Sequence, residues 1–416
     1  MPHIPLHSTD RDAPPQRVFI TGAGMISPLG NNEQAHIDAL RAGRTHFREI
    51  DFFDVSRQRV KTAGVSDPST MAYALTPHEA ARLDRGTWLL LHATAQAISG
   101  VKPTDIHPET PFILGTSAGA MATGEAYYQL ATTAPHGRSG QFARVEHYQP
   151  QRQAGEVQRA LNFRARTQII SNACASGANA IGHAFHMIRS GRESMALAGG
   201  YDALCQLVFA GFDSLQALAL SGIPRPFDAH RDGLALGEGA AVFVLESAES
   251  MAARGAVPIA EICGYGMATD LHHLTQPHPA GTAAVRSMSA ACKQAEMTPT
   301  DIHYINSHGT GTPLNDIAEA NAISQWAGEQ VKNIAVSSTK SAMGHLLGGA
   351  GAIESAICIL ALKHQLLPAN LNVNEIDPAC HFDLIQEPRD AKLGAALTNS
   401  FGFGGSNASL IFRTVN

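Results

Sequence analysis

Short apolar runs alternate along this chain with longer stretches in which apolar residues recur at three-to-four spacing. Residues 18–25, 112–115 and 240–245 are apolar runs that predict buried strands. Residues 88–98 and 353–362 have helical spacing and predict helices that pack against those strands. The alternation favours an α/β fold in which helices cover sheets.

The pattern recurs in the second part of the chain. The text I-x-G-x-G-M occurs at residues 20–25 and again at 262–267, in each case where a predicted strand turns through two glycines. Two further pairs follow in the same order: residues 112–117 with 304–309, and the junction at Cys174 with residues 336–340. Three pairs of similar segments that occur in the same order indicate a duplicated α/β half. We expect a flexible polar leader at residues 1–16, a first half at 17–257 and a second half at 258–416.

Composition excludes several classes of protein. With 416 residues, 44% of them hydrophobic and 16% charged, the chain can bury a large core and differs from disordered chains. The six cysteines form no C-x-x-C pair and the leader lacks the apolar core of a secretory signal, so we expect a cytoplasmic protein. A net charge of −6 offers no general attraction to nucleic acid. The apolar stretch 348–362 is too short to span a membrane.

The glycines at residues 22 and 24 follow a predicted strand, as they do in a dinucleotide-binding loop. However, Ser27 occupies the position at which that loop needs its third glycine. A dinucleotide site is therefore not favoured.

Cys174 lies where an apolar helix begins. Ile181, Ala184 and Ile188 recur at helical spacing after it, and Gly191 stands where a helix would end. The unpaired N–H groups at a helix start favour an anion, so we expect the pKa of this thiol to lie below its reference value of about 8.5. That would make Cys174 a nucleophile. The same residue also fits a small buried filler, as most free cysteines are.

Two histidines and a lysine are further candidates for chemistry. His308 begins a glycine-threonine turn after a predicted strand, which is expected to hold the side chain at a sheet edge rather than bury it. His345 is flanked by glycines, and Lys340 follows an apolar strand at the position that Cys174 has in the first half. Glu354 lies inside an apolar helix, where an unpaired carboxylate would be costly. Each of these residues alone also fits a structural role.

A glycine-rich turn at residues 399–407 is expected between the last two strands. Its exposed N–H groups would suit a developing oxyanion, and a tight loop between strands would explain the glycines equally well.

Five motifs in this order resemble the elongating β-ketoacyl-acyl carrier protein synthases, and the similarity runs from Val18 to the end of the chain. The motifs are A-C-A-S-G at residues 173–177, P-F-D-A-H-R-D-G at 226–233, H-G-T-G-T at 308–312, S-S-T-K-S-x-x-G-H at 337–345 and S-F-G-F-G-G-S-N at 400–407. The resemblance implies the thiolase fold, with two pseudo-twofold-related α/β halves that form a five-layered αβαβα core.

The resemblance also implies a decarboxylative Claisen condensation. Cys174 would carry the acyl chain, His308 and His345 would bind the malonyl thioester oxygen, Lys340 would order the site and Phe403 would gate acyl entry. The N–H groups of Cys174 and Phe403 would form the oxyanion hole. Thr275, Thr310 and Thr312 would line the pantetheine channel, and the further substrate-binding positions would be Ala118, Phe212, Phe401 and Gly404. This chemistry needs no metal and no cofactor.

The implied partner is an acyl carrier protein that presents acyl and malonyl groups on phosphopantetheine, and the implied assembly is a homodimer or a heterodimer with a related subunit. Gln216 replaces a carrier-contacting arginine, which makes other arginines the candidates for an acidic carrier. Those candidates are Arg82, Arg85, Arg138 and Arg144.

Small Ala118 favours room for a long or stiff chain, and both fatty acid and polyketide or polyene substrates stay open. An alternative is a non-catalytic, chain-length-factor-like partner subunit, although such subunits usually lack the cysteine that this chain retains. A degradative thiolase would need a second cysteine near the C-terminus, and residues 402–407 contain none.

Overall fold

A computed structural model describes residues 15–67, 73, 75–81, 83–133 and 148–415 of the chain. Residues 1–14 of the predicted leader lie outside the described residues. The described strands form one 11-stranded sheet and two small two-stranded sheets. The large sheet has the order β12-β10-β9-β14-β15-β8-β1-β7-β6-β4-β5.

The large sheet consists of two groups of strands that meet at β1 and β8. The first group is β1 (Val18–Ile26), β4 (Pro111–Gly115), β5 (Arg166–Ile170), β6 (Met195–Asp202) and β7 (Gly239–Ser247). The second group is β8 (Ala260–Thr269), β9 (Tyr304–Asn306), β10 (Ala335–Ser337), β12 (Asp383–Leu384), β14 (Ala395–Gly402) and β15 (Ser406–Arg413). Only three residue pairs, from Val18↔Ile262 to Ile20↔Ala260, join the two groups.

The two groups have the same topology. The order β5-β4-β6-β7-β1 in the first matches β10-β9-β14-β15-β8 in the second. In both, the first three strands run parallel and the last two pair antiparallel. The duplicated architecture that the sequence predicts is therefore confirmed. The boundary at residue 258 stays a prediction; Pro258 lies between α9 (Ala248–Arg254) and β8.

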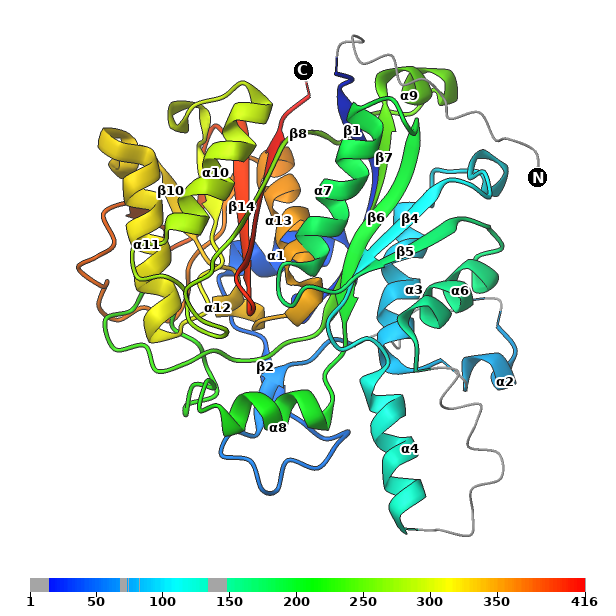
Figure 1. Cartoon of the computed structure of the whole chain (residues 1–416), viewed down its shortest axis with the longest axis horizontal. Coiled ribbons are helices and arrows are strands. Elements are labelled where there is room, and N and C mark those ends of the chain that lie inside the picture. The colour runs from blue at the N-terminus through cyan, green and yellow to red at the C-terminus, as the bar shows by residue number, and fades with distance from the viewer. Residues whose placement is uncertain (1–14, 68–72, 74, 82, 134–147, 416) are drawn as a thin grey trace.

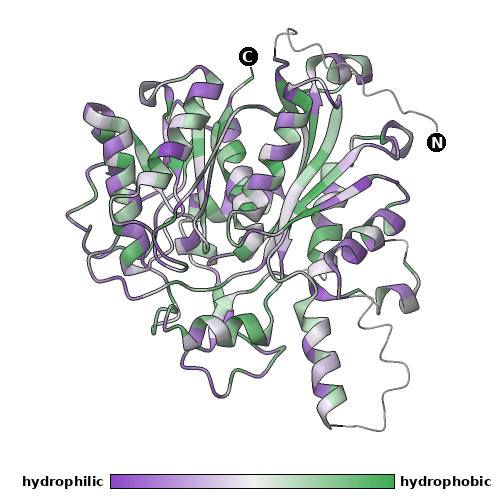
Figure 2. Ribbon diagram, in the orientation of Figure 1, coloured by the Kyte–Doolittle hydropathy of each residue, from purple (hydrophilic) through white to green (hydrophobic). Residues whose placement is uncertain are grey.

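Helices separate and cover the two groups of strands in five layers (Figure 1). The middle layer is α7 (Ser176–Arg189) and α13 (Ala350–His364), which contact strands of both groups. One outer layer is α3 (Arg85–Ala97) with α6 (Pro150–Ala160), and the other is α10 (Thr282–Ala295) with α11 (Pro313–Ala327). Figure 2 shows the inner strands mostly green and the outer helices with purple faces, as expected for helices that cover a core on one side.

The remaining described elements surround these layers. They are α1 (Glu33–Ala42), β2 (Phe47–Glu49), β3 (Thr62–Gly64), α2 (Pro77–Ala80), η1 (Pro103–Asp105), α4 (Met121–Thr133), α8 (Gln206–Ser214), η2 (Pro299–Asp301), η3 (Gly328–Asn333), α12 (Lys340–Met343), η4 (Leu347–Gly349), β11 (Leu366–Leu367) and β13 (Arg389–Asp390). The prediction that the apolar stretch at 348–362 is too short to cross a membrane is wrong, because the helical stretch Leu347–His364 is long and apolar enough. However, 89% of it is buried inside the protein, where it belongs to the middle layer.

Two local predictions need correction. The turn predicted at residues 399–407 is only residues 403–405, because β14 and β15 continue their pairing to Gly402↔Ser406. In the second half, α13 does not follow β10 directly as α7 follows β5. The short helix α12 and the turn η4 intervene, and Gly344, with φ of 82°, ends α12.

This topology brings chemistry-bearing loops together. The loops after β4, β5, β9 and β10 all leave the carboxyl ends of parallel strands. In open α/β sheets that edge is where ligands bind. Because the middle helices pack on each other, the loops after β5, β9 and β10 contribute residues to one cavity.

Candidate active site

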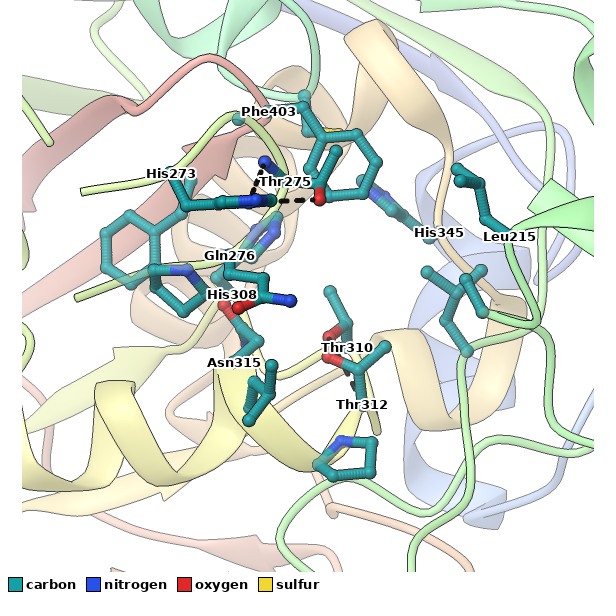
Figure 3. A pocket seen from close by; sticks show the side chains of 18 of the residues that line it. Leu215, His273, Thr275, Gln276, His308, Thr310, Thr312, Asn315, His345 and Phe403 are labelled. Carbon is teal, nitrogen blue, oxygen red and sulfur yellow. Dashed lines mark hydrogen bonds between the residues drawn. The ribbon is translucent and has the colours of Figure 1, made fainter. Parts of the chain in front are cut away.

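A cavity of about 360 Å³ lies between the two halves and holds most of the predicted site residues (Figure 3). Cys174 comes from the first half, and His308 and His345 come from the second. The cavity is also lined by six other predicted positions: Phe212, Thr275, Thr310, Thr312, Phe401 and Phe403. Side chains that are distant in the sequence therefore share one space.

Cys174 stands on a tight strand-to-helix turn. The preceding Ala173 has φ of 55°, a left-handed conformation that costs a non-glycine residue energy. The hydroxyls of Ser117 and Ser176 donate to the Ala173 carbonyl oxygen at 2.9 and 2.6 Å and hold the turn in place. Helix α7 begins at Ser176, so the sulfur lies just before its first turn. The turn places Cys174 at the cavity rather than within the helix.

The predicted low pKa of Cys174 is wrong for the free protein. Burial raises the pKa of this thiol to about 12, and the Asp202 carboxylate adds to that increase. The Lys340 ammonium and the Phe403 N–H act in the opposite direction, and burial outweighs them. Cys174 is therefore a thiol at neutral pH, and its proton must leave as the sulfur attacks.

The two histidine rings lie edge to face, with their centroids 5.3 Å apart. Both are buried, which corrects the prediction that His308 sits at an exposed sheet edge. Burial lowers the pKa of each well below 6.5, and the nearby Lys340 charge lowers both further. Both rings are therefore neutral at physiological pH.

The hydrogen-bonding state of each ring follows from its neighbours. Lys340 Nζ lies 3.4 Å from His308 Nδ1, and since an ammonium can only donate, the ring proton of His308 is on Nε2. Neither ring nitrogen of His345 has a partner in the described part of the chain, although both are buried. A buried polar group without a partner is uncommon and calls for a ligand.

Lys340 lies behind the histidines and forms a buried ion pair with Glu354; both side chains are 1% exposed. Burial raises the pKa of Glu354 to about 7, against the lowering effect of the lysine. The carboxylate that appeared costly in the sequence is thus paired, and the pair fixes a positive charge beside His308.

Glu319 was not identified from the sequence. Its carboxylate accepts the N–H groups of His308 at 2.8 Å and Gly309 at 2.7 Å, as well as the Asn399 amide at 3.2 Å. Burial raises its pKa to about 7. Glu319 therefore sets the position of the His308 backbone. Its only sequence signal is a carboxylate inside the largely apolar helix α11, the same signal that drew attention to Glu354.

Asp202, at the end of β6, was also missed. Its buried carboxylate accepts N–H groups of Ser117 at 3.0 Å, Ala118 at 2.9 Å and Gly348 at 2.6 Å. The loop after β4 is thereby tied to the turn that follows His345. One carboxylate therefore links the two halves of the chain.

Two phenylalanines stand beside Cys174. The Phe403 ring stacks on Phe212 with centroids 6.0 Å apart, and its backbone N–H points to the Cys174 sulfur. The β14–β15 hairpin can approach this closely because residue 402 is glycine: a Cβ there would lie 3.2 Å from the Cys174 nitrogen. Phe401 packs against His308 at 5.4 Å.

Ala118 and Gly404 are not among the described residues that line the cavity. Ala118 lies in an adjoining hydrophobic cluster with Phe209 and Leu347, against which Phe212 packs. Gly404 donates its N–H to the Leu274 carbonyl oxygen at 2.7 Å, so it holds the loop after β8 instead.

Of the four arginines proposed for carrier contact, the structure describes only Arg85. Arg85 is used internally, since it donates to the buried Glu238 at 2.7 Å and its charge lies over the Phe52 ring at 4.4 Å. Arg82, Arg138 and Arg144 lie outside the described residues. Gln216 lines the cavity, as do four residues that the sequence did not single out: Leu215, His273, Gln276 and Asn315.

Comparison with known proteins gives one family over nearly the whole chain. Residues 15–251 match the model described as "Beta-ketoacyl synthase, N-terminal domain", and residues 259–374 match "Beta-ketoacyl synthase, C-terminal domain". A 3-oxoacyl-[acyl-carrier-protein] synthase 2 of Synechocystis sp. is 36% identical over 408 residues, which cover 96% of this chain and 98% of that protein.

Two solved structures extend the comparison. The ishigamide ketosynthase/chain length factor superimposes with a TM-score of 0.90 at 31% identity, covering 97% of this chain and 100% of that one. A type II polyketide synthase assembly, AntDE:AntF, in which an acyl-carrier protein is in complex with its ketosynthase, gives 0.86 at 28% identity, with 97% and 100% coverage. These likenesses confirm the predicted thiolase-type fold.

Proposed function

The chain belongs to the β-ketoacyl synthase family and is a condensing acyltransferase, and from that premise we propose how its own residues carry the reaction. Cys174 receives an acyl chain from a carrier-protein thioester. His308 and His345 then assist the decarboxylation of malonyl-carrier protein, and the resulting carbanion attacks the acyl-Cys174 thioester. The product is a β-ketoacyl chain on the carrier protein.

In the first step the Cys174 sulfur attacks the acyl carbonyl carbon, the new carbon–sulfur bond forms and the bond to the carrier thiol breaks. Because the thiol has a pKa of about 12, its proton must pass to a base during attack. That base is the departing carrier sulfur, which leaves as the carrier thiol, so acylation needs neither histidine. The N–H groups of Cys174 and Phe403 bind the oxyanion of the tetrahedral intermediate.

In the second step the malonyl carboxylate leaves as CO₂ and its electron pair forms an enolate. The enolate oxygen takes a hydrogen bond from Nε2–H of His308 and another from the unpartnered ring of His345. Carbon attack on the acyl group then expels the Cys174 thiolate, which takes up a proton from water. Lys340 acts as a positioning residue, since its charge adds to burial in keeping both rings neutral.

We assign the polar wall of the cavity, Thr275, Thr310 and Thr312, to the pantetheine arm. The acyl chain extends past the Phe212–Phe403 stack toward the cluster that contains Ala118. Small Ala118 supports a chain longer or stiffer than a bulky residue would admit. Saturated acyl chains and polyketide or polyene intermediates both fit this arrangement.

One observation carries the assignment: a thiol and two neutral imidazoles line the same cavity, and one imidazole has no partner for either nitrogen among the described residues. A non-catalytic partner subunit has no need for that set, so the chain-length-factor-like alternative is disfavoured.

We further propose that the protein works in the cytoplasm as a dimer, either with itself or with a related subunit. The edge strand β5 and the exposed helix α4, which buries none of its described side chains, support such pairing. The ketosynthase/chain length factor structure supports the heterodimer in particular. Light scattering of the purified chain, alone and with a candidate partner, tests the two arrangements.

The proposed activity is tested by offering purified protein a panel of acyl-carrier proteins with malonyl-carrier protein and weighing the products. We expect a β-ketoacyl product two carbons longer than the donor chain, and release of CO₂. Absence of extended product from every donor, with correctly folded protein, would contradict the proposal. The donor that is extended best identifies the substrate class.

A further inference from the structure

The opening of the cavity is surrounded by exposed leucines. Leu215, Leu220, Leu274 and Leu314 are 59%, 65%, 72% and 53% exposed, and we call this set the leucine rim. Leu215, Leu274 and Leu314 line the cavity itself. Leu220 lies next to it, because its N–H donates at 3.0 Å to Asp232, which is a lining residue.

The four leucines come from separate segments. Leu215 follows α8, Leu220 is on the next loop, Leu274 is on the loop between β8 and α10, and Leu314 is in the first turn of α11. Figure 3 shows Leu215 on one side of the opening, with His273, Gln276 and Asn315 across from it. Single exposed leucines are ordinary, but a group around one opening marks a place where a partner binds.

The charges around the opening do not suit a strongly acidic partner. No lysine or arginine lines the cavity in the described ranges, whereas Asp232 and Asp270 do. Two arginines on neighbouring segments are engaged: Arg225 donates to His230 O at 2.7 Å and lies 3.3 Å from Asp232, and Arg59 pairs with Asp213 of α8 at 3.2 Å. Arg286 donates to Thr269 O at 2.8 Å.

We propose that the leucine rim is the docking surface for the carrier protein, and that it selects a carrier whose recognition face is apolar. The proposal rests on the function assigned above, because a chain delivered to Cys174 must enter through this opening. A second copy of the protein seated here would close the entrance, so the occupant is the transient donor. Docking then depends on burying leucine side chains and only weakly on ion pairs.

The test compares two acyl donors. One is the best donor from a panel of acyl-carrier proteins, and the other is the acyl thioester of N-acetylcysteamine, which reaches Cys174 without docking. The variant carries Leu215→Ser, Leu220→Ser, Leu274→Ser and Leu314→Ser together. The control is Val257→Ser, which alters a 79% exposed apolar side chain on the linker before β8.

We expect the four-leucine variant to raise KM for the acyl-carrier protein at least tenfold, the equivalent of about 1.4 kcal/mol. That increase should exceed any change in acylation by the cysteamine thioester, which reports how the substitutions affect the cavity that Leu215, Leu274 and Leu314 line. The unfolding temperature stays as in the parent, and Val257→Ser changes neither reaction. We also expect the parent's KM for the carrier to change less than about twofold between about 0.1 and about 1 M salt, over which the Debye length falls from about 10 to about 3 Å.

Three results would overturn the proposal: an unchanged KM in the four-leucine variant, a steep increase of KM with salt, or a change of oligomeric state on mutation, which would make the rim an interface between copies. Acylation by the cysteamine thioester but by no carrier in the panel would also overturn it while leaving Cys174 as the nucleophile. Acylation by neither donor would instead refute the proposed function itself.

Discussion

The β5–α7 junction and the β10–α13 junction hold corresponding positions in two groups of strands with the same order, yet they contain different chemistry. The first presents a thiol on a strained turn, with the Asp202 carboxylate nearby. The second buries the Lys340–Glu354 ion pair and presents His345. A duplicated framework has thus come to supply a nucleophile from one half and charge and proton control from the other.

The largest effect is expected from a substitution at the first junction. Cys174→Ala removes the only sulfur that lines the cavity among the described residues, so acylation should be abolished. Intact-protein mass spectrometry after incubation with an acyl thioester measures this directly. Cys263→Ala, which alters a buried cysteine outside the cavity, is the control and should acylate normally. Retained acylation of Cys174→Ala would refute the assignment.

Changing either cavity histidine of the second half should leave acylation intact but impair condensation. His345→Ala and His308→Ala each remove one donor to the enolate, and we expect condensation to fall about 10²–10³-fold. The acylated enzyme should still accumulate when the donor is supplied alone. Normal condensation rates in both variants would mean that the enolate is stabilised elsewhere.

The next largest effect is expected on stability, when the Lys340–Glu354 ion pair is broken. Glu354→Gln leaves the Lys340 charge buried without its partner, and the free energy of unfolding should drop by about 3–5 kcal/mol. The double variant Lys340→Met/Glu354→Gln removes both charges and should recover most of that loss in a denaturant titration. If the double variant were as unstable as the single one, lost packing rather than lost pairing would be the cause.

A smaller effect concerns pH. Both histidines have a pKa held below 6.5, so they remain neutral as pH falls toward 6.5, and condensation should decline only below that value. The stability that comes from keeping them neutral is present above pH 6.5 and is lost as pH falls through their folded-state pKa. Lys340→Met removes a charge that lowers both pKa values, so the acid limb should move to higher pH. A pH profile that is identical in the parent and the variant would show that Lys340 does not act on the rings.

The sequence predicted the framework well because apolar spacing reports directly on burial. The helices around residues 88–98 and 353–362, and the strands at residues 18–25 and 240–245, lie where expected. The motifs also predicted Cys174, His308 and His345 as site residues, and all three line the cavity. In these cases the information is local or is carried by the motif itself.

What the sequence did not predict depends on tertiary surroundings. The sign of the Cys174 pKa shift was wrong because a helix start can be recognised in a sequence, whereas the burial that outweighs it cannot. Similarly, a glycine-threonine turn gave no sign that His308 would be covered, or that Glu319 would hold its backbone. The leucine rim was missed because its members meet only when distant segments fold together.

The most direct measurement of the division between the two halves is CO₂ release from malonyl-carrier protein by Cys174→Ala and by the His308→Ala/His345→Ala double variant, alongside acylation of each. We predict that Cys174→Ala releases CO₂ without becoming acylated, and that the double histidine variant becomes acylated with little CO₂ release. Loss of both activities in both variants, with the folds intact, would contradict the account.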